Sequence, residues 1–369
     1  MTLTNYWWLL IWLFIAGVVF CMFPVTRYEN VFGKREVRWG IFPAIVLVCP
    51  YVIWATFRPD DWGDTYSYRY LYDLVPSSLE QLETYAASVS KDKGFAVLSV
   101  IIKSFFGSSE IPFFFILALI QMLCVVLILR KYSCNYWLSI FLFIASTDYM
   151  SWMHNGVRQF TAVALVFVTT GLILKKKYIP LIFVILIAST IHGSALLMIP
   201  IVFIIQGKAW NKKTLLCILA SVLALIFVNQ FTSILDTLLA DTQYMNVVSD
   251  WQALTDNGTN PIRVLVYSVP TIFSLIGYKY IKSTDDPVIN MAVNAGIVAT
   301  AIAIVSMGTS GVFIGRLPIY CSMYSTGILL PWELKNMFED NSARLMTIIA
   351  VACYIVFFYY QMHITWRLI

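Results

Sequence analysis

No charged residue interrupts the stretch Tyr6-Trp-Trp-Leu-Leu-Ile-Trp-Leu-Phe-Ile-Ala-Gly-Val-Val-Phe-Cys-Met-Phe23. A helix of this length is nearly long enough to cross ~30 Å of hydrocarbon, and similar runs recur to the C-terminus. Of the 369 residues, 60% are hydrophobic and 12% are charged, whereas a soluble domain carries about 25% charge. The sequence therefore predicts an all-α polytopic integral membrane protein, since the period-2 alternation of a transmembrane barrel is absent.

About twelve membrane spans (roughly 11–13) follow from these runs. The predicted spans are residues 6–24, 39–57, 111–129, 136–150, 157–174, 178–190, 193–206, 214–234, 262–280, 289–307, 312–331 and 345–363. Residues 94–106 are too short for a span and are predicted to form an interfacial or re-entrant helix. No repeat or linker divides the chain, so residues 1–369 are expected to form a single transmembrane domain.

Basic residues concentrate in alternate loops, and this pattern predicts the orientation. With the N-terminus outside, the inside loops hold 16 of the 25 Lys and Arg residues. Treating 178–206 as one tilted span would put the basic loop at 208–213 outside, so a broken hairpin with its tip at 191–193 is preferred. The two sizeable outer segments are then 58–93 and 235–261. Of the 20 acidic residues, 13 also fall outside.

Cysteine and histidine usage gives no indication of a metal centre. The seven cysteines show no CxxC spacing and mostly lie within apolar runs, as small core hydrophobic residues do. Only three histidines are present, and no Asp-x-Asp pattern accompanies the polar clusters. The expectation is a protein with no metal, no cofactor and no nucleic-acid partner.

A polar cluster, Asp148-Tyr-Met-Ser-Trp-Met-His-Asn-Gly-Val-Arg-Gln159, separates two apolar segments. On a continuous helix, His154 and Arg158 would share one face, with Asn155 and Gln159 beside them. An arginine one turn inside a membrane helix is costly and indicates function, although a snorkelling anchor is the alternative. Guanidinium pairs with phosphate oxygens, and a helix N-terminus favours anions. We therefore predict that this cluster binds a lipid-linked diphosphate.

Other polar residues are predicted at the same outer surface. They are Asp64, Tyr66 and Tyr70 in an outer segment rich in tyrosine, His192 at the hairpin tip, Arg263 at a helix start, and Arg316 about one turn inside a span. Tyrosines suit a sugar ring or a membrane interface equally well. Arg158, Arg316 and Arg263 are the predicted cations for a diphosphate, and Asp64 or His192 is the predicted base for an acceptor hydroxyl.

Several of these pieces together resemble the EpsG family of bacterial membrane proteins, which is grouped with Wzy-type polysaccharide polymerases. The matching pieces are Asp64-Thr-Tyr-Ser-Tyr-Arg-Tyr70, Lys93-Gly-Phe95, Asn155-Gly-Val-Arg-Gln-Phe-Thr-Ala162, His192-Gly-Ser-Ala195 and Gly315-Arg-Leu-Pro-Ile-Tyr320. They occur in order across residues 58–330. Each piece is short, and it is their order among apolar spans that makes the resemblance specific.

The resemblance implies a membrane glycosyltransferase bundle in the bacterial inner membrane, working at its periplasmic face, where segments 58–93 and 235–261 would lie. The implied substrate is an undecaprenyl-diphosphate-linked oligosaccharide. Its growing chain would be transferred onto the non-reducing end of the next repeat unit, giving an O-antigen, capsule or exopolysaccharide. Membrane lipid is an implied partner, and a chain-length regulator is a further candidate partner.

Two other functions are compatible with parts of this pattern. An O-antigen ligase or a polysaccharide acyltransferase would act on the same glycolipids with a different acceptor. A flippase or transporter would carry charged residues along a mid-span pathway and show inverted repeats. Because the charges stay near one surface and no repeat is evident, the sequence favours the enzyme.

Overall fold

The structure is a computed structural model that describes residues 3–239 and 258–368. Its contacts group the chain into two compact units, Met1–Leu197 with Glu339–Ile369, and Met198–Phe338. A single membrane domain over residues 1–369 stays a prediction. Most of the predicted outer segment 235–261 lies outside the described residues.

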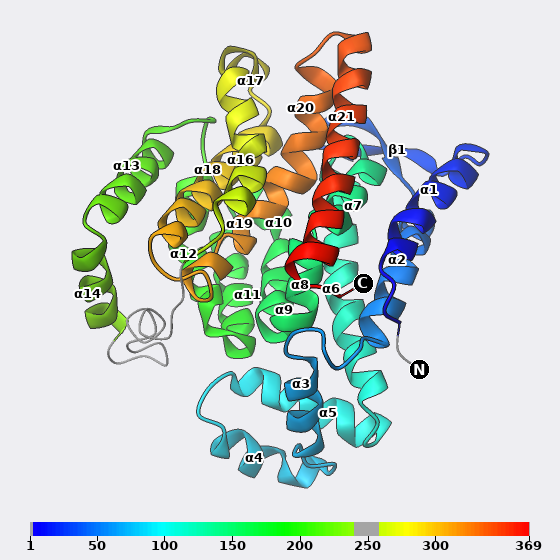
Figure 1. The fold of residues 1–369 in the computed structure, drawn as a ribbon, viewed down its shortest axis with the longest axis vertical. Helices are drawn as coiled ribbons and strands as arrows, with labels where there is room; N and C mark the ends of the chain where they lie inside the picture. Colours follow the sequence, from blue (N-terminus) through cyan, green and yellow to red (C-terminus); the bar gives the residue numbers. More distant parts are fainter. Residues whose placement is uncertain (1–2, 240–257, 369) are drawn as a thin grey trace. The chain divides into compact units, whose positions relative to one another are not determined.

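The first unit is a helical bundle with one β-hairpin (Figure 1). In chain order its elements are α1 (Trp7–Cys21), β1 (Thr26–Val31), β2 (Lys34–Trp39), α2 (Ile41–Thr56), α3 (Thr65–Asp73), η1 (Leu79–Gln81), α4 (Leu82–Ser88), α5 (Lys93–Phe106), α6 (Glu110–Tyr132), α7 (Tyr136–Ala145), α8 (Asp148–Asn155), α9 (Val157–Phe167), α10 (Thr170–Leu174), α11 (Tyr178–Ile191), η2 (Gly193–Leu197), α21 (Asp340–Tyr359) and the π-helical η5 (Tyr360–Thr365). The C-terminal α21 returns to pack on α7.

The second unit is helical throughout its described part. Its elements are α12 (Met198–Ile205), α13 (Lys212–Ile226), α14 (Val228–Leu239), α16 (Pro261–Ile276), α17 (Tyr278–Thr284), α18 (Pro287–Met307), η3 (Ile314–Arg316), α19 (Ile319–Tyr324), the π-helical η4 (Ser325–Leu329) and α20 (Leu330–Asn336). The long α18 is central, since α13, α16 and α19 all pack against it. Asp286 caps α18 by accepting from two backbone N–H groups, and Pro287 follows at the first helical position.

The all-α prediction needs one correction at residues 26–39. These residues form an antiparallel hairpin, which is the one sheet among the described residues. Phe32 (φ 50°) and Gly33 (φ 81°) make its turn, and two consecutive residues of positive φ match the twist of paired strands. The Asn30 side chain accepts a hydrogen bond from the Gly33 N–H at 2.8 Å. The charge pattern of the sequence predicts only a basic loop here.

The structure does not confirm the predicted number of twelve membrane spans. Three helices in the described chain are long and apolar enough to cross a membrane: Glu110–Tyr132, Pro287–Met307 and Asp340–Thr365. Two bent pairs raise the number to five if each pair is one span, and six shorter apolar helices accompany them. Each predicted span coincides with one or more of the helices, so the apolar segments were placed correctly. Two of the predicted spans, 214–234 and 262–280, contain a sharp bend, because hydropathy does not show where a helix breaks.

The short helix at 94–106 and the break at 191–193 were both predicted from the sequence. The helix α5 covers the predicted 94–106 helix, while its interfacial or re-entrant placement stays a prediction. Between α11 and η2, His192 is extended (φ −155°, ψ 119°), so no continuous helix runs through 178–206. The predicted break at 191–193 is therefore present.

Candidate functional site

The β-hairpin and the helices α3, α4 and α5 lie at opposite ends of the first unit (Figure 1), and the two ends differ in their charged residues. At the hairpin end, Arg38 Nε donates to the Lys131 carbonyl at 2.8 Å, which joins β2 to the end of α6. A Cβ at Gly171 would lie 3.1 Å from the Tyr132 hydroxyl, so α10 and the basic loop after it reach the same end. The hairpin end thus collects Arg27, Lys34, Arg35, Arg38, Arg130, Lys131 and residues 175–177.

The opposite end, which we call the pocket end, is built by α3, α4, α5 and the start of α6 (Figure 1). It carries Asp60, Asp61, Asp64, Asp73, Glu80, Glu83, Asp92 and Glu110. Lys103 is buried and donates to the carbonyls of Tyr72 and Asp73 at 2.8 and 3.0 Å, which holds the end of α3 against α5. Its charge is therefore used inside the fold.

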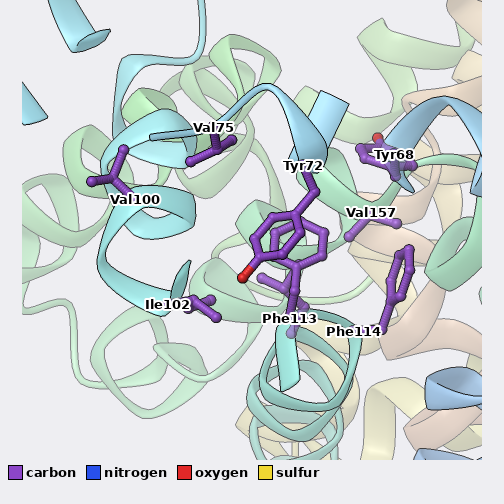
Figure 2. Packing of buried hydrophobic residues seen from close by; sticks show 9 residues of the cluster. Tyr68, Tyr72, Val75, Val100, Ile102, Phe113, Phe114 and Val157 are labelled. Atoms are coloured by element: carbon purple, nitrogen blue, oxygen red, sulfur yellow. The ribbon is translucent and has the colours of Figure 1, made fainter. Parts of the chain in front are cut away.

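An apolar cluster fixes these helices to one another. Figure 2 shows Tyr72 lying against Phe113, with ring centroids 4.5 Å apart and planes at 27°. Val100 from α5 and Val157 from α9 belong to the same cluster, and both are fully buried. The cluster therefore makes α3, α5, α6 and the start of α9 one rigid support.

A cavity of about 160 Å³ lies beside this cluster. Its lining comprises Tyr68, Leu71, Tyr72, Val75, Tyr85, Val89, Lys91, Asp92, Phe95, Ala96, Ser99, Phe113 and Arg158. Aromatic rings form much of the wall, and the charged groups converge from the start of α5 and the start of α9. Apolar walls with a few converging polar groups are typical of small-molecule sites.

Arg158 and Asp92 form an ion pair at this cavity. The Arg158 Nη1 lies 2.9 Å from Asp92 Oδ2, and the two side chains are 31% and 6% exposed. Asp92 occupies the N-cap position of α5 but makes no capping hydrogen bond there, and its φ of 56° is in the left-handed region. An unusual backbone conformation of this kind accompanies a carboxylate that is directed at Arg158 rather than at its own helix.

Burial raises the pKa of the Asp92 carboxyl above its ordinary value. Arg158, then Lys91, then the backbone amide of Gly193 oppose this shift without cancelling it. The cause is loss of hydration, since a carboxylate removed from water favours its neutral form. A buried acid with a perturbed pKa beside a cation in a cavity is a functional-site candidate.

The turn between α11 and η2 adjoins the same ion pair. The His192 Nδ1 lies 2.7 Å from the Ser194 hydroxyl, and Gln159 Nε2 donates to that hydroxyl at 3.5 Å. Gly94 is packed so closely against Thr190 that a Cβ there would overlap the threonine side chain. The starts of α5 and α9 and the end of α11 therefore converge, and three predicted site residues, Arg158, Gln159 and His192, lie in this region.

His154 occupies a different environment from the predicted one. Gly156 (φ −117°, ψ 44°) separates α8 from α9, so His154 and Arg158 lie on different helices and the predicted shared face was wrong. The ring of His154 is 1% exposed, stacks on Trp62 at 4.2 Å, and its Nδ1 lies 2.7 Å from the Met150 carbonyl. Its Nε2 lies 3.3 Å from the Tyr6 hydroxyl. These contacts give His154 a packing role.

Asn155 links α3 to the turn between α8 and α9. Its Oδ1 accepts from the Asp64 backbone N–H at 3.2 Å, and a Cβ at Gly63 would overlap the Asn155 side chain. Asp64 itself is exposed and does not line the cavity. The tyrosines of α3 divide similarly: Tyr66 and Tyr70 are 67% and 57% exposed, and other tyrosines of that helix line the cavity.

Arg263 and Arg316 belong to the second unit, where they share one end. The Thr259 N–H donates to the Ser306 carbonyl at 3.0 Å, so the chain entering α16 lies beside the end of α18. Arg263 lies in the first turn of α16 with its Nε 3.3 Å from the Tyr267 hydroxyl, and Arg316 ends η3, which packs against α18. Their roles in diphosphate binding stay predictions.

The cavity lining includes five residues that were not among the site residues predicted from the sequence: Lys91, Asp92, Tyr68, Tyr72 and Phe95. Asp92 comes just before the Lys93-Gly-Phe95 piece. The charged residues Asp92 and Lys93, followed by a glycine and an apolar run, were the sequence signal that could have indicated a site here. Tyr68 and Tyr72 lie on the opposite stripe of α3 from the predicted Tyr66 and Tyr70. Which stripe faces inward depends on α6, and the spacing alone does not show it.

The fold and this site define a class: a polytopic helical membrane protein with an aromatic cavity that holds a buried carboxylate and an arginine. The model of the EpsG family matches residues 41–366, and the chain belongs to that family. Comparison with curated proteins found no match, and neither did comparison with solved structures. Membership and the apolar helices indicate a membrane protein with a polysaccharide polymerase role, of the glycosyltransferase type.

Proposed function

We propose that this protein polymerises undecaprenyl-diphosphate-linked oligosaccharide repeat units at the periplasmic face of the bacterial inner membrane. The observation that carries the proposal is the cavity with Arg158 and Asp92 at the pocket end, opposite the hairpin end. Lys and Arg residues favour the cytoplasmic side of a membrane, so the hairpin end would face the cytoplasm. The cavity would then open toward the periplasm.

The chemistry of the cavity suits glycosyl transfer from a lipid diphosphate. Negative charge develops on the leaving diphosphate, and a preorganised cation stabilises it. Arg158 is the second residue of α9, so backbone N–H groups and the helix dipole add to its guanidinium. Tyr68, Tyr72 and Phe95 supply ring faces against which a sugar packs. The growing chain would leave its diphosphate for the non-reducing end of the next unit.

Other residues have supporting roles in this proposal. Arg316 and Arg263 are second cations for the donor, and Asp64 or His192 is a candidate to accept a hydrogen bond from the acceptor hydroxyl and orient it. His192 is followed by Gly193, whose backbone amide hydrogen-bonds to Asp92. Tyr66 and Tyr70 offer exposed rings on which the glycan could rest outside the cavity.

The test compares Arg158→Ala and Arg316→Ala in cells that lack the native copy, with surface glycan resolved on a gel. Lys175→Ala, an exposed lysine at the hairpin end, is the matched control. The expected result is glycan of single repeat units for the two arginine variants and a full ladder for the control, at equal membrane levels. Undiminished ladders in the arginine variants would overturn the proposal, and loss of single-unit glycan would favour a flippase or a ligase.

The orientation is tested by labelling. In a background without native cysteines, Ser77→Cys at the pocket end should react with a membrane-impermeant thiol reagent in spheroplasts. Lys176→Cys at the hairpin end should react only after permeabilisation. Both positions are exposed, so the difference would report the side of the membrane. The reverse pattern would contradict a periplasmic cavity.

A further inference from the structure

The Arg158–Asp92 pair is built so that it can open. Arg158 Nη1 donates to Asp92 Oδ2, and the arginine is 31% exposed and lines the cavity. Asp92 is nearly buried, so it bears the cost of lost hydration while the arginine keeps access to the cavity. An anion with more charge than one carboxylate would compete for this guanidinium from the cavity.

Asp92 is also placed where a released carboxylate would meet the second substrate. It lines the cavity together with Lys91 and Arg158, and Tyr68, Tyr72 and Tyr85 are the other titratable groups of the lining. The Gly193 amide approaches it from the turn that also holds His192. The backbone of Asp92 is held by α5, whose second residue, Gly94, is packed on Thr190. The carboxylate therefore has little freedom to leave the cavity.

We propose an exchange of partners: the donor diphosphate takes Arg158 from Asp92, and the released Asp92 carboxylate acts as the base for the acceptor hydroxyl. The hydroxyl oxygen forms the new bond to the anomeric carbon. The bond from that carbon to the phosphate oxygen breaks, and its electron pair stays with the lipid diphosphate. The hydroxyl proton goes to Asp92. This mechanism rests on the proposed function and makes donor binding the step that activates the base.

The raised pKa of Asp92 supports this assignment. A general base is most effective when its pKa lies near the working pH. The raised pKa brings Asp92 closer to that value than an ordinary carboxyl group. Loss of the Arg158 contact would remove the largest of the opposing effects and raise the pKa further. Donor binding would thus make the carboxylate a stronger base just when the acceptor needs one.

The test measures binding and turnover together on the full-length protein in nanodiscs. Binding is measured with inorganic pyrophosphate, and turnover with lipid-linked repeat units extracted from cells without the polymerase. Asp92→Asn should bind pyrophosphate roughly three- to tenfold more tightly than the native protein, because the competing charge is gone. Its turnover should fall by about a hundredfold or more, because the base is gone. A merely structural role would lower both quantities.

Asp92→Ser removes the same charge and replaces the Asn variant if that variant does not fold. Glu29→Gln removes the carboxylate that pairs with Arg130 at the hairpin end, at 2.6 Å, and should leave pyrophosphate affinity unchanged. If the native protein binds pyrophosphate and both Asp92 variants bind it more weakly or equally, the exchange is wrong while the diphosphate site stands. If Asp92→Asn keeps full turnover, the base is another residue. No pyrophosphate binding by any of these proteins would remove the diphosphate site and the exchange with it.

Discussion

Arg130 and Arg158 each meet a carboxylate, at opposite ends of the first unit, and the two carboxylates respond in opposite ways. Arg130 reaches both oxygens of Glu29, at 2.6 and 3.1 Å, and also donates to the Trp39 carbonyl at 2.7 Å. These hydrogen bonds lower the pKa of Glu29, with help from Arg27. Around Asp92, burial outweighs the opposing effects of Arg158, Lys91 and the Gly193 amide, and it raises the pKa of the carboxyl group.

The difference lies in what surrounds each guanidinium. The Arg130 side chain is 7% exposed and is directed at protein acceptors from two strands, so it fastens the hairpin to α6. Arg158 lines a cavity, and its carboxylate partner is more buried than it is. A pair that satisfies its carboxylate stabilises the fold, whereas a pair that leaves the carboxylate underhydrated is suited to exchange partners. The four predictions below separate these two behaviours.

The largest effect is expected for Arg130→Ala. The substitution removes a nearly buried guanidinium with its hydrogen bonds to Glu29 and to the Trp39 carbonyl, and should lower the free energy of unfolding by about 3 kcal/mol. Membrane levels should fall, and the protein that remains should still polymerise. The measurement is thermal unfolding in detergent with ladder length per amount of protein, and Lys175→Ala is the control, expected within about 0.5 kcal/mol. A stable but inactive Arg130→Ala would reverse our comparison of the pairs.

Gly94→Ala should be nearly as damaging, at the other end of the unit. The new methyl group would overlap the Thr190 side chain and lie 2.9 Å from its backbone carbonyl carbon, so α5 and α11 must separate. Overpacking of this kind costs about 2 kcal/mol, and the shift of Asp92 should also reduce polymer length. In Gly40→Ala at the hairpin end, the nearest atoms are 3.4 Å away and the change should stay within about 1 kcal/mol. Equal effects at both glycines would argue against a tight junction at Gly94.

Arg158→Lys should lower polymer formation by about tenfold or more with little change in stability. Lysine keeps the charge but loses the planar, bidentate geometry that suits a phosphate. The measurement is turnover on lipid-linked repeat units together with the apparent Tm. The matched variant is Arg130→Lys, for which we expect the reverse: lower stability and preserved turnover per folded molecule. Full turnover of Arg158→Lys would show that only a point charge is needed.

The smallest effects concern pH and have opposite signs. The folded-state pKa of Glu29 is lowered, so its contribution to stability is present above its unfolded pKa of about 4.3 and is lost as pH falls through the folded value. The folded-state pKa of Asp92 is raised, so its contribution is present below about 3.9 and is lost as pH rises through the folded value.

At neutral pH, Glu29→Gln should therefore lower the apparent Tm, and Asp92→Asn should leave it equal or higher. Each change is expected to be about 1 kcal/mol or less. The measurement is a series of melting curves from acid to neutral pH on both variants and the native protein. If Asp92→Asn melted well below the native protein at neutral pH, the pair at the cavity would be a structural one.

Much of the fold could be predicted from local sequence properties. Charge-free runs mark the helices, and the alternation of Lys and Arg loops matches the charge difference between the two ends of the first unit. The hairpin was missed because its residues are charged and its two strands are short. Twelve spans stay a prediction, because helix breaks such as those at Phe227 and Gly277 depend on backbone conformation and not on hydropathy.

The site was predictable only in part, and for a clear reason. The polar pieces around Arg158 and His192 mark unusual chemistry in an apolar chain, and composition alone shows that. The partner of Arg158 lies 66 residues away in sequence, and the packing of α11 against both α5 and α9 brings it there. Likewise α6 decides which tyrosines of α3 face the cavity. By itself the sequence determined the class of protein and the side on which charge collects, because hydropathy and charge are local. Only the tertiary structure decided which carboxylate meets which arginine, because that choice depends on contacts between distant segments.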